Sequence, residues 1–164
     1  MPWIDREAAL RRAGEVLSEG TCLICHLVAS AAVVARGARA RVLLPRMGRA
    51  EGHLLVALDR HVTSFAAVGD DEWAEASALA LRAARALEAA LRPARCYVAS
   101  LGSAREGLPM SSPHLHVHVL PVDDPAARPG RVLSWEDGVF AASEAEAAAI
   151  LSRVRAAWAA EGSP

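Results

Sequence analysis

The sequence predicts an α+β domain whose antiparallel sheet is interrupted, along the chain, by one long helix. Four short apolar segments typical of strands lie at 41–44, 53–58, 96–101 and 114–122. An amphipathic helix is predicted between the second and third of them, and strands that follow one another in this way favour an antiparallel arrangement. The chain has 164 residues, of which 53% are apolar, which suits a single domain with a sizeable core.

In the first part of the chain, residues 4–19 are predicted to form a short amphipathic helix that ends at Gly20. Residues 27–35 are apolar and fit either a helix or a strand. The strand at 41–44 is expected to stop at Pro45, with a loop over 46–52 before the next strand. A two-stranded hairpin is the simplest arrangement of these two strands.

The clearest helix is predicted over 71–91. It has acidic residues at its start and a proline, Pro93, just after its end. Six residues spaced by three or four would form its buried face: Trp73, Ala76, Ala80, Ala83, Leu87 and Ala90. A loop is expected over 102–113, a segment rich in proline, glycine and arginine over 123–131, and a last helix over 144–159 with Ser143 as its N-cap.

Composition excludes several classes of protein. A formal net charge of −1 argues against a general polyanion-binding surface, so no nucleic-acid partner is expected. The longest apolar run, 27–35, is too short to span a bilayer, and the charged N-terminus does not resemble a signal peptide. With only three cysteines, we expect a protein of the reducing cytoplasm without a disulfide framework.

Three histidines alternate with apolar residues in the segment His114-Leu115-His116-Val117-His118. Because alternate residues of a strand point to the same face, the sequence predicts one line of three imidazoles, with Leu115, Val117 and Val119 on the opposite, apolar face. The pattern alone leaves open a solvated strand face or a simple His-x-His metal site.

Residues 114–120 resemble the signature of the histidine triad (HIT) hydrolases, in which three histidines alternate with apolar residues. Residues 52–61, from Gly52-His53 to His61, resemble the family's Gly-His strand, with Leu58 where the family has proline. The Cys22-x-x-Cys25 pair is similar to one near the start of many bacterial members. The resemblance implies a single HIT-like domain over 1–164, with an N-terminal helical extension at 1–20, the family core at 21–122 and a C-terminal loop and helix at 123–164.

The resemblance also implies an activity: hydrolysis at the α-phosphate of a dinucleoside polyphosphate or a nucleoside phosphoramidate. By residue match, His116 would be the nucleophile that forms a nucleotidyl-histidine, and His118 and His53 would contact the phosphate. Ser111 stands where the family often has a hydroxyl near the leaving group. A homodimer is the family's usual state. The alternative is a nucleotide-binding or regulatory protein of this fold with little turnover.

The resemblance implies a structural zinc ion as well. In zinc-bearing members the cysteine pair is joined by two histidines, which correspond to His61 and His114 here, so Cys22, Cys25, His61 and His114 would form the ligand set. The cysteine pair itself also fits a c-type haem site, since His26 follows Cys25, a redox pair, or two buried apolar thiols. Cys96 is expected to be a core residue.

The sequence departs from the family just before the triad. Pro109 and Met110 stand where many members have glycine and glutamine, and Ser100 stands where they have asparagine. The chain contains no Asn or Gln at all, so no carboxamide elsewhere can take over this role. The hydrogen bonds around the leaving group are therefore expected to differ from those of other members.

Overall fold

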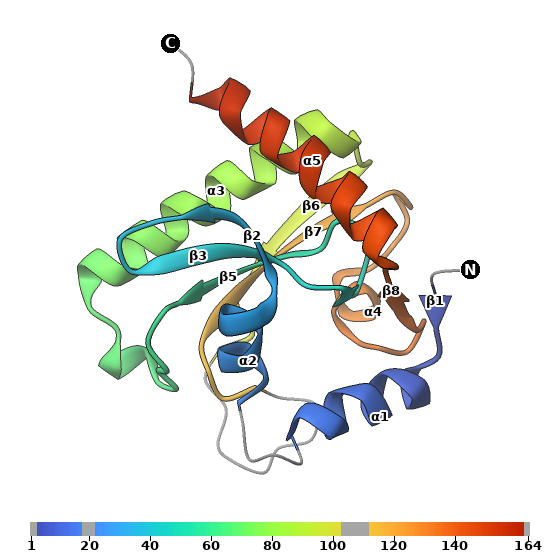
Figure 1. The fold of residues 1–164 in the computed structure, drawn as a ribbon, viewed down its shortest axis with the longest axis horizontal. Coiled ribbons are helices and arrows are strands. Elements are labelled where there is room, and N and C mark those ends of the chain that lie inside the picture. Colours follow the sequence, from blue (N-terminus) through green and yellow to red (C-terminus); the bar gives the residue numbers. More distant parts are fainter. Residues whose placement is uncertain (1–2, 18–21, 103–111, 163–164) are drawn as a thin grey trace.

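The computed structural model describes residues 3–17, 22–102 and 112–162. The predicted α+β class is confirmed, because the centre of the molecule is a five-stranded, fully antiparallel sheet in the order β2-β3-β5-β7-β6 (Figure 1). Its strands are β2 (Ala32–Arg36), β3 (Ala40–Leu44), β5 (Leu54–Leu58), β6 (Arg95–Ala99) and β7 (His116–Val122).

Helices cover both faces of this sheet. The long helix α3 (Asp70–Leu91) and the last helix α5 (Glu144–Glu161) pack together on one face, and α2 (Leu23–Ser30) packs on the other (Figure 1). A second, small sheet has the order β1-β8-β4. The remaining elements are β1 (Trp3–Ile4), α1 (Arg6–Leu17), β4 (Met47–Gly48), the short 3-10 helix η1 (Phe65–Ala67), α4 (Pro129–Leu133) and β8 (Val139–Ala141).

Several sequence predictions are confirmed to within one or two residues. The hairpin strands β3 and β5 pair antiparallel, α3 starts one residue before its predicted position, and Ser143 caps α5 by accepting a hydrogen bond from the Glu146 N–H. The segment 27–35, which fits either a helix or a strand by its sequence, contains both: helix α2 continues to Ser30, and strand β2 starts at Ala32.

Two predictions about individual elements are wrong. The last long strand starts at His116, so His114 lies in the turn before it. Trp73 is not part of the buried face of α3. It is 39% exposed and packs edge-to-face on Phe65 of the preceding 3-10 helix, because it lies in the first turn of α3, next to that helix.

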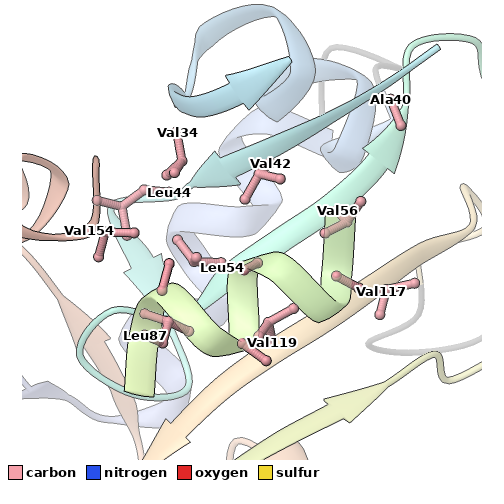
Figure 2. Close-up of a cluster of buried hydrophobic side chains, with 14 of the residues drawn as sticks. Val34, Ala40, Val42, Leu44, Leu54, Val56, Leu87, Val117, Val119 and Val154 are labelled. Carbon is pink, nitrogen blue, oxygen red and sulfur yellow. The ribbon is translucent and has the colours of Figure 1, made fainter. Parts of the chain in front are cut away.

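The main core lies between the sheet and the helices α3 and α5. Alternate residues of the strands supply it, among them Leu54 and Val56 of β5 and Val117 and Val119 of β7, and Leu87 of α3 lies over them (Figure 2). The facing surface of α3 consists almost entirely of alanines, which lets the helix approach the sheet closely. Cys96 packs at the border of this core, as expected.

Leu87→Ala is expected to lower the free energy of unfolding by about 2–5 kcal/mol, because the fully buried side chain would leave a cavity among alanines that cannot fill it. The matched control is Leu81→Ala on the same helix, whose side chain is 54% exposed and whose effect should be within about 0.5 kcal/mol. Urea unfolding of the two variants measures the difference. Equal losses would contradict the assignment of the buried face.

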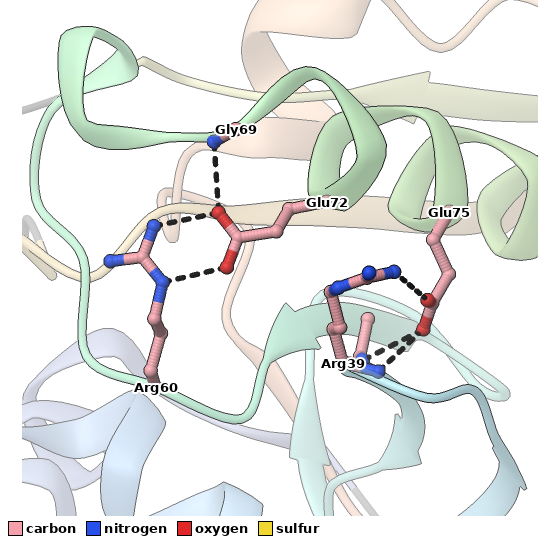
Figure 3. Close-up of polar contacts among 6 residues, drawn as sticks. Arg39, Arg60, Gly69, Glu72 and Glu75 are labelled. Atoms are coloured by element: carbon pink, nitrogen blue, oxygen red, sulfur yellow. Dashed lines mark hydrogen bonds and ion pairs between the residues drawn. The ribbon is translucent and has the colours of Figure 1, made fainter.

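Ion pairs tie the start of α3 to the turns of the sheet (Figure 3). Arg60 binds both carboxylate oxygens of Glu72 at 2.6 Å, and Glu72 also accepts the backbone N–H of Gly69, which caps the helix. These hydrogen bonds lower the pKa of Glu72 to about 2, with Arg60 as the largest cause. Glu75 accepts the backbone N–H groups of Arg39 and Ala40 in the turn between β2 and β3. Both contacts fix the helix over the sheet.

Among the described residues, no helix is long and apolar enough to cross a membrane.

Candidate functional site

Two triad histidines lie on the face of the sheet that α3 does not cover. On β7 the alternation of side chains sends Val117 and Val119 toward α3, and His116 and His118 toward the opposite face, as predicted. Their neighbours on β5 are Ala57 and Leu55, which belong to the small core under α2. His53, directly before β5, is buried next to them.

His114 points away from this group. It precedes the strand, and the backbone N–H of the next residue, Leu115, donates to the Val62 carbonyl instead of joining the β5–β7 ladder. The fully buried imidazole of His114 lies beside His61 and Cys25. The predicted line of three imidazoles is therefore wrong in one respect. The histidines form two groups with different surroundings.

The first group forms one continuous chain of hydrogen bonds. The backbone N–H of Arg49 donates to His53 Nδ1 at 3.2 Å, and His53 Nε2 is 3.0 Å from His118 Nδ1. His118 Nε2 is 3.1 Å from His116 Nε2, and His116 Nδ1 is 2.8 Å from the carbonyl oxygen of His114. A backbone donor thus closes one end of the chain and a backbone acceptor closes the other.

These ends determine where each proton sits. Because the His114 carbonyl can only accept, His116 carries its proton on Nδ1, and its Nε2 has a free electron pair. His118 then donates from Nε2 to His116, and His53 donates from Nε2 to His118. The Arg49 N–H meets the remaining acceptor, His53 Nδ1. Three neutral imidazoles satisfy the whole chain, with one donor and one acceptor each.

Electrostatics favour the same neutral state. Burial is the main cause that lowers the pKa of His53, to about 3, and it also lowers the pKa values of His116 and His118. The guanidinium of Arg49 adds to the effect on all three imidazoles. At neutral pH the imidazole of His116 is therefore an unprotonated base and nucleophile at Nε2.

The second group brings Cys22, Cys25, His61 and His114 together, with all four ligand atoms within 4.8 Å of one another. Cys25 Sγ lies 3.2 Å from His61 Nδ1 and 3.4 Å from His114 Nδ1. With zinc bonds of about 2.0–2.3 Å, ligand atoms of a tetrahedral site lie about 3.3–3.8 Å apart. Two thiols and two imidazoles at this spacing fit a closed Cys₂His₂ site, and the four residues are those that the family resemblance implies.

The cysteine pair does not share its site with His26. His26 is the fourth residue of α2, and its backbone N–H bonds to the Cys22 carbonyl in the first helical turn. Its side chain is not among the grouped ligands, because the two histidines that join the cysteines come from the segment after β5 and from the turn before β7. The geometry favours the metal-ligand interpretation over c-type haem attachment.

A family model for the HIT domain matches residues 26–124. The chain belongs to the HIT domain family. No curated protein sequence matches it significantly.

Solved structures show that this HIT-domain protein shares its fold with distant relatives. A Hit-like protein involved in cell-cycle regulation from Bartonella henselae superposes with a TM-score of 0.66 at 15% identity, covering 84% of this chain and 96% of that one. A zinc-bound histidine triad family protein from Mycobacterium smegmatis superposes with a TM-score of 0.64 at 22% identity, covering 87% of this chain and 96% of that one. A uridylyltransferase superposes with a TM-score of 0.63 at 19% identity, covering 94% of this chain and 52% of that one.

The HIT-domain chain positions His53 with two glycines. A Cβ atom at Gly48 would lie 2.8 Å from His53 Cβ and 2.9 Å from its Nδ1, so strand β4 passes directly over the imidazole. Gly52, directly before His53, has a φ of +77°, a conformation that other residues rarely adopt. Sequence reasoning recognised Gly52 by its motif, but nothing in the pattern of 46–51 marked Gly48 or Arg49 as neighbours of the histidines.

Gly48→Ala is expected to displace His53, because the new methyl group would overlap the imidazole, and to cost about 1–3 kcal/mol of stability through overpacking. The His53–His118 hydrogen bond should be lost, which ¹⁵N NMR of the imidazoles detects. Gly14→Ala is the control, since no atom lies within 4 Å of its added Cβ. An unchanged tautomer pattern in Gly48→Ala would contradict the role given to this glycine.

Ser111, which the resemblance places near the leaving group, lies outside the described residues, as do Pro109 and Met110. Ser112 is described, and its hydroxyl lies 3.7 Å from Cys22 Sγ, beside the metal-ligand cluster. Ser100 follows β6 and contacts the backbone N–H of Gly102.

Proposed function

We propose that this HIT-domain protein hydrolyses nucleotides at the α-phosphate through a covalent nucleotidyl-histidine on His116. The hydrogen-bond chain from Arg49 to His114 carries this proposal, because it keeps His116 Nε2 unprotonated. Such a nitrogen can attack phosphorus without a separate base. Dinucleoside polyphosphates and nucleoside phosphoramidates are the substrates that we propose.

The first steps use the three histidines of the hydrogen-bond chain. His116 Nε2 bonds to the α-phosphorus while the bond from phosphorus to the leaving group breaks. His118, whose Nε2–H faces His116 Nε2 at 3.1 Å, donates to a phosphoryl oxygen or to the oxygen or nitrogen of the leaving group once a phosphate separates the two rings. His53 holds His118 in this tautomer and borders the phosphate site. Water then cleaves the nucleotidyl-histidine, and Ser111 remains our candidate for a contact to the leaving group.

We propose a structural role for zinc in the Cys22, Cys25, His61 and His114 cluster, as in the bacterial zinc-bearing members of the family. Such a site has no open position for substrate, so its contribution is to folding. It joins the start of α2, the segment after β5 and the turn before β7. Through His114, whose carbonyl accepts the His116 proton, the metal would also position the nucleophile.

We also propose a homodimer that forms through the edge strand β6 and acts in the cytoplasm. This strand ends the order of the five-stranded sheet, so one of its edges is unpaired among the described residues. Val98 on this strand and Leu101 just after it are 50% and 57% exposed. Apolar side chains on an open strand edge are typical of a surface covered by another chain.

A substrate panel tests the proposed activity. Purified protein is incubated separately with diadenosine tetraphosphate and adenosine 5′-phosphoramidate, and released AMP is quantified by chromatography. We expect AMP from at least one substrate, and the same rate from the control variant His26→Ala, whose histidine belongs to neither group. Tight binding of both compounds without AMP would support a binding protein instead.

A further inference from the structure

A cavity of about 580 Å³ lies at the end of β7 away from the metal-ligand cluster. The small sheet, helix α4 and the 49–51 segment enclose it, together with the C-terminal residues of β7 and the 123–124 segment that follows. This volume suits a small organic molecule. The cavity is not lined by any of the four candidate metal ligands, nor by any of the three histidines of the hydrogen-bond chain.

Arg49 connects the cavity to the histidines. Its backbone N–H belongs to the hydrogen-bond chain, and its side chain lines the cavity. The guanidinium lies against Trp135 at 5.8 Å, and it faces no carboxylate within ion-pair distance among the described residues. Its Nη1 atom is buried and has no hydrogen-bond partner among the described residues. A buried cationic donor without a partner is costly, and an anionic ligand would satisfy it.

The rest of the lining defines the other parts of a ligand. Trp3 and Phe140 contribute aromatic surface that suits the apolar face of a sugar ring. Glu51, Asp123 and Asp124 contribute carboxylates that accept hydrogen bonds from hydroxyl groups. Two other arginines line the cavity, but Arg131 is paired with Asp137 and Arg153 donates to the Ala90 carbonyl, so Arg49 is the better candidate to bind a phosphate.

We propose that this cavity binds a phosphorylated, hydroxyl-bearing group and that Arg49 contacts its phosphate. Resting on the proposed function, the cavity takes the leaving group of the nucleotide substrate, because Arg49 lines the cavity and its backbone N–H binds His53, which borders the proposed phosphate site. For a nucleoside diphosphate sugar, His116 Nε2 bonds to the α-phosphorus, and the bridging oxygen leaves with its electron pair as part of the sugar phosphate. Water then releases the nucleoside monophosphate and regenerates His116.

Two substrates with the same adenylyl group separate this role from catalysis in general. ADP-ribose would release ribose 5-phosphate, and adenosine 5′-phosphoramidate would release only ammonia. Arg49→Met removes the cation and keeps the side-chain length, and Arg49→Lys keeps the charge without the forked donor. Arg85→Met is the control, because this arginine is exposed on α3 and does not line the cavity.

We expect Arg49→Met to lower the ratio of kcat/KM for ADP-ribose to that for the phosphoramidate by about ten- to hundredfold, the effect of losing a hydrogen bond to a charged group. Arg49→Lys should give an intermediate ratio, and Arg85→Met the wild-type ratio. An equal decrease for both substrates in Arg49→Met would overturn the proposal.

Direct binding keeps the test independent of turnover. Isothermal titration of the full chain with ribose 5-phosphate should show binding by the wild-type protein and a loss of affinity of about tenfold or more in Arg49→Met. Wild-type protein that does not bind ribose 5-phosphate, or a variant that binds it equally well, would overturn the pocket. Binding without hydrolysis of either substrate would instead contradict the proposed function and leave the pocket assigned.

Discussion

His116→Ala is expected to reduce kcat for AMP release by at least about 10³-fold, because it removes the atom that we propose forms the covalent intermediate. Its Nε2 carries no proton and accepts a hydrogen bond from His118 Nε2. His118 cannot replace it, since its Nε2 carries a proton and its Nδ1 accepts from His53. Initial rates at saturating substrate measure the effect.

The fold of this variant should survive, because His116 is only half-buried and lies outside the main core. Circular dichroism and the thermal midpoint check this, and His26→Ala controls for the loss of an imidazole as such. Substrate affinity should change much less than kcat. A loss of rate below about tenfold, in a folded variant, would contradict the covalent role of His116.

Removal of the proposed metal ligand Cys25 is expected to have the largest effect on stability. The wild-type protein should contain about one zinc ion per chain, measured by mass spectrometry of the metal. Cys25→Ser should lose the ion and unfold at a markedly lower temperature, because metal binding is coupled to folding and the thiol lies 3.2–3.4 Å from two other ligand atoms. Cys22→Ser should also lose the ion and unfold at a lower temperature than the wild-type protein.

Cys96→Ser is the matched control, since this third cysteine borders the main core and does not belong to the cluster. It should keep its zinc. Wild-type protein without metal, and equally stable in the presence of a chelator, would remove His61 and His114 from the ligand set. A Soret absorption band would point to haem on the cysteine pair instead.

The histidines illustrate how far the sequence can be interpreted. The spacing of His116 and His118 predicts a shared face, and the structure has it, because both lie within a regular strand. The same spacing fails for His114, since periodicity cannot show that the strand begins two residues later. The prediction of His114 as a metal ligand came from the family resemblance, and the structure brings it to Cys25.

Short elements and long-range contacts could not be predicted from the sequence. Strands β1, β4 and β8 have two or three residues each, which is too few for any periodic pattern. They nevertheless enclose the cavity and place Gly48 against His53. Arg49 is one of many arginines in the chain, and only its burial beside three imidazoles distinguishes it.

The central claim is that His116 carries the nucleotidyl group during turnover. The most direct measurement is mass spectrometry of the intact protein, quenched during incubation with diadenosine tetraphosphate or adenosine 5′-phosphoramidate, followed by peptide mapping under conditions that preserve phosphorus–nitrogen bonds. We expect a fraction of the chains to gain the mass of one adenylyl group, located on His116 and absent from His116→Ala. AMP release without any adduct, or an adduct on another residue, would contradict the account.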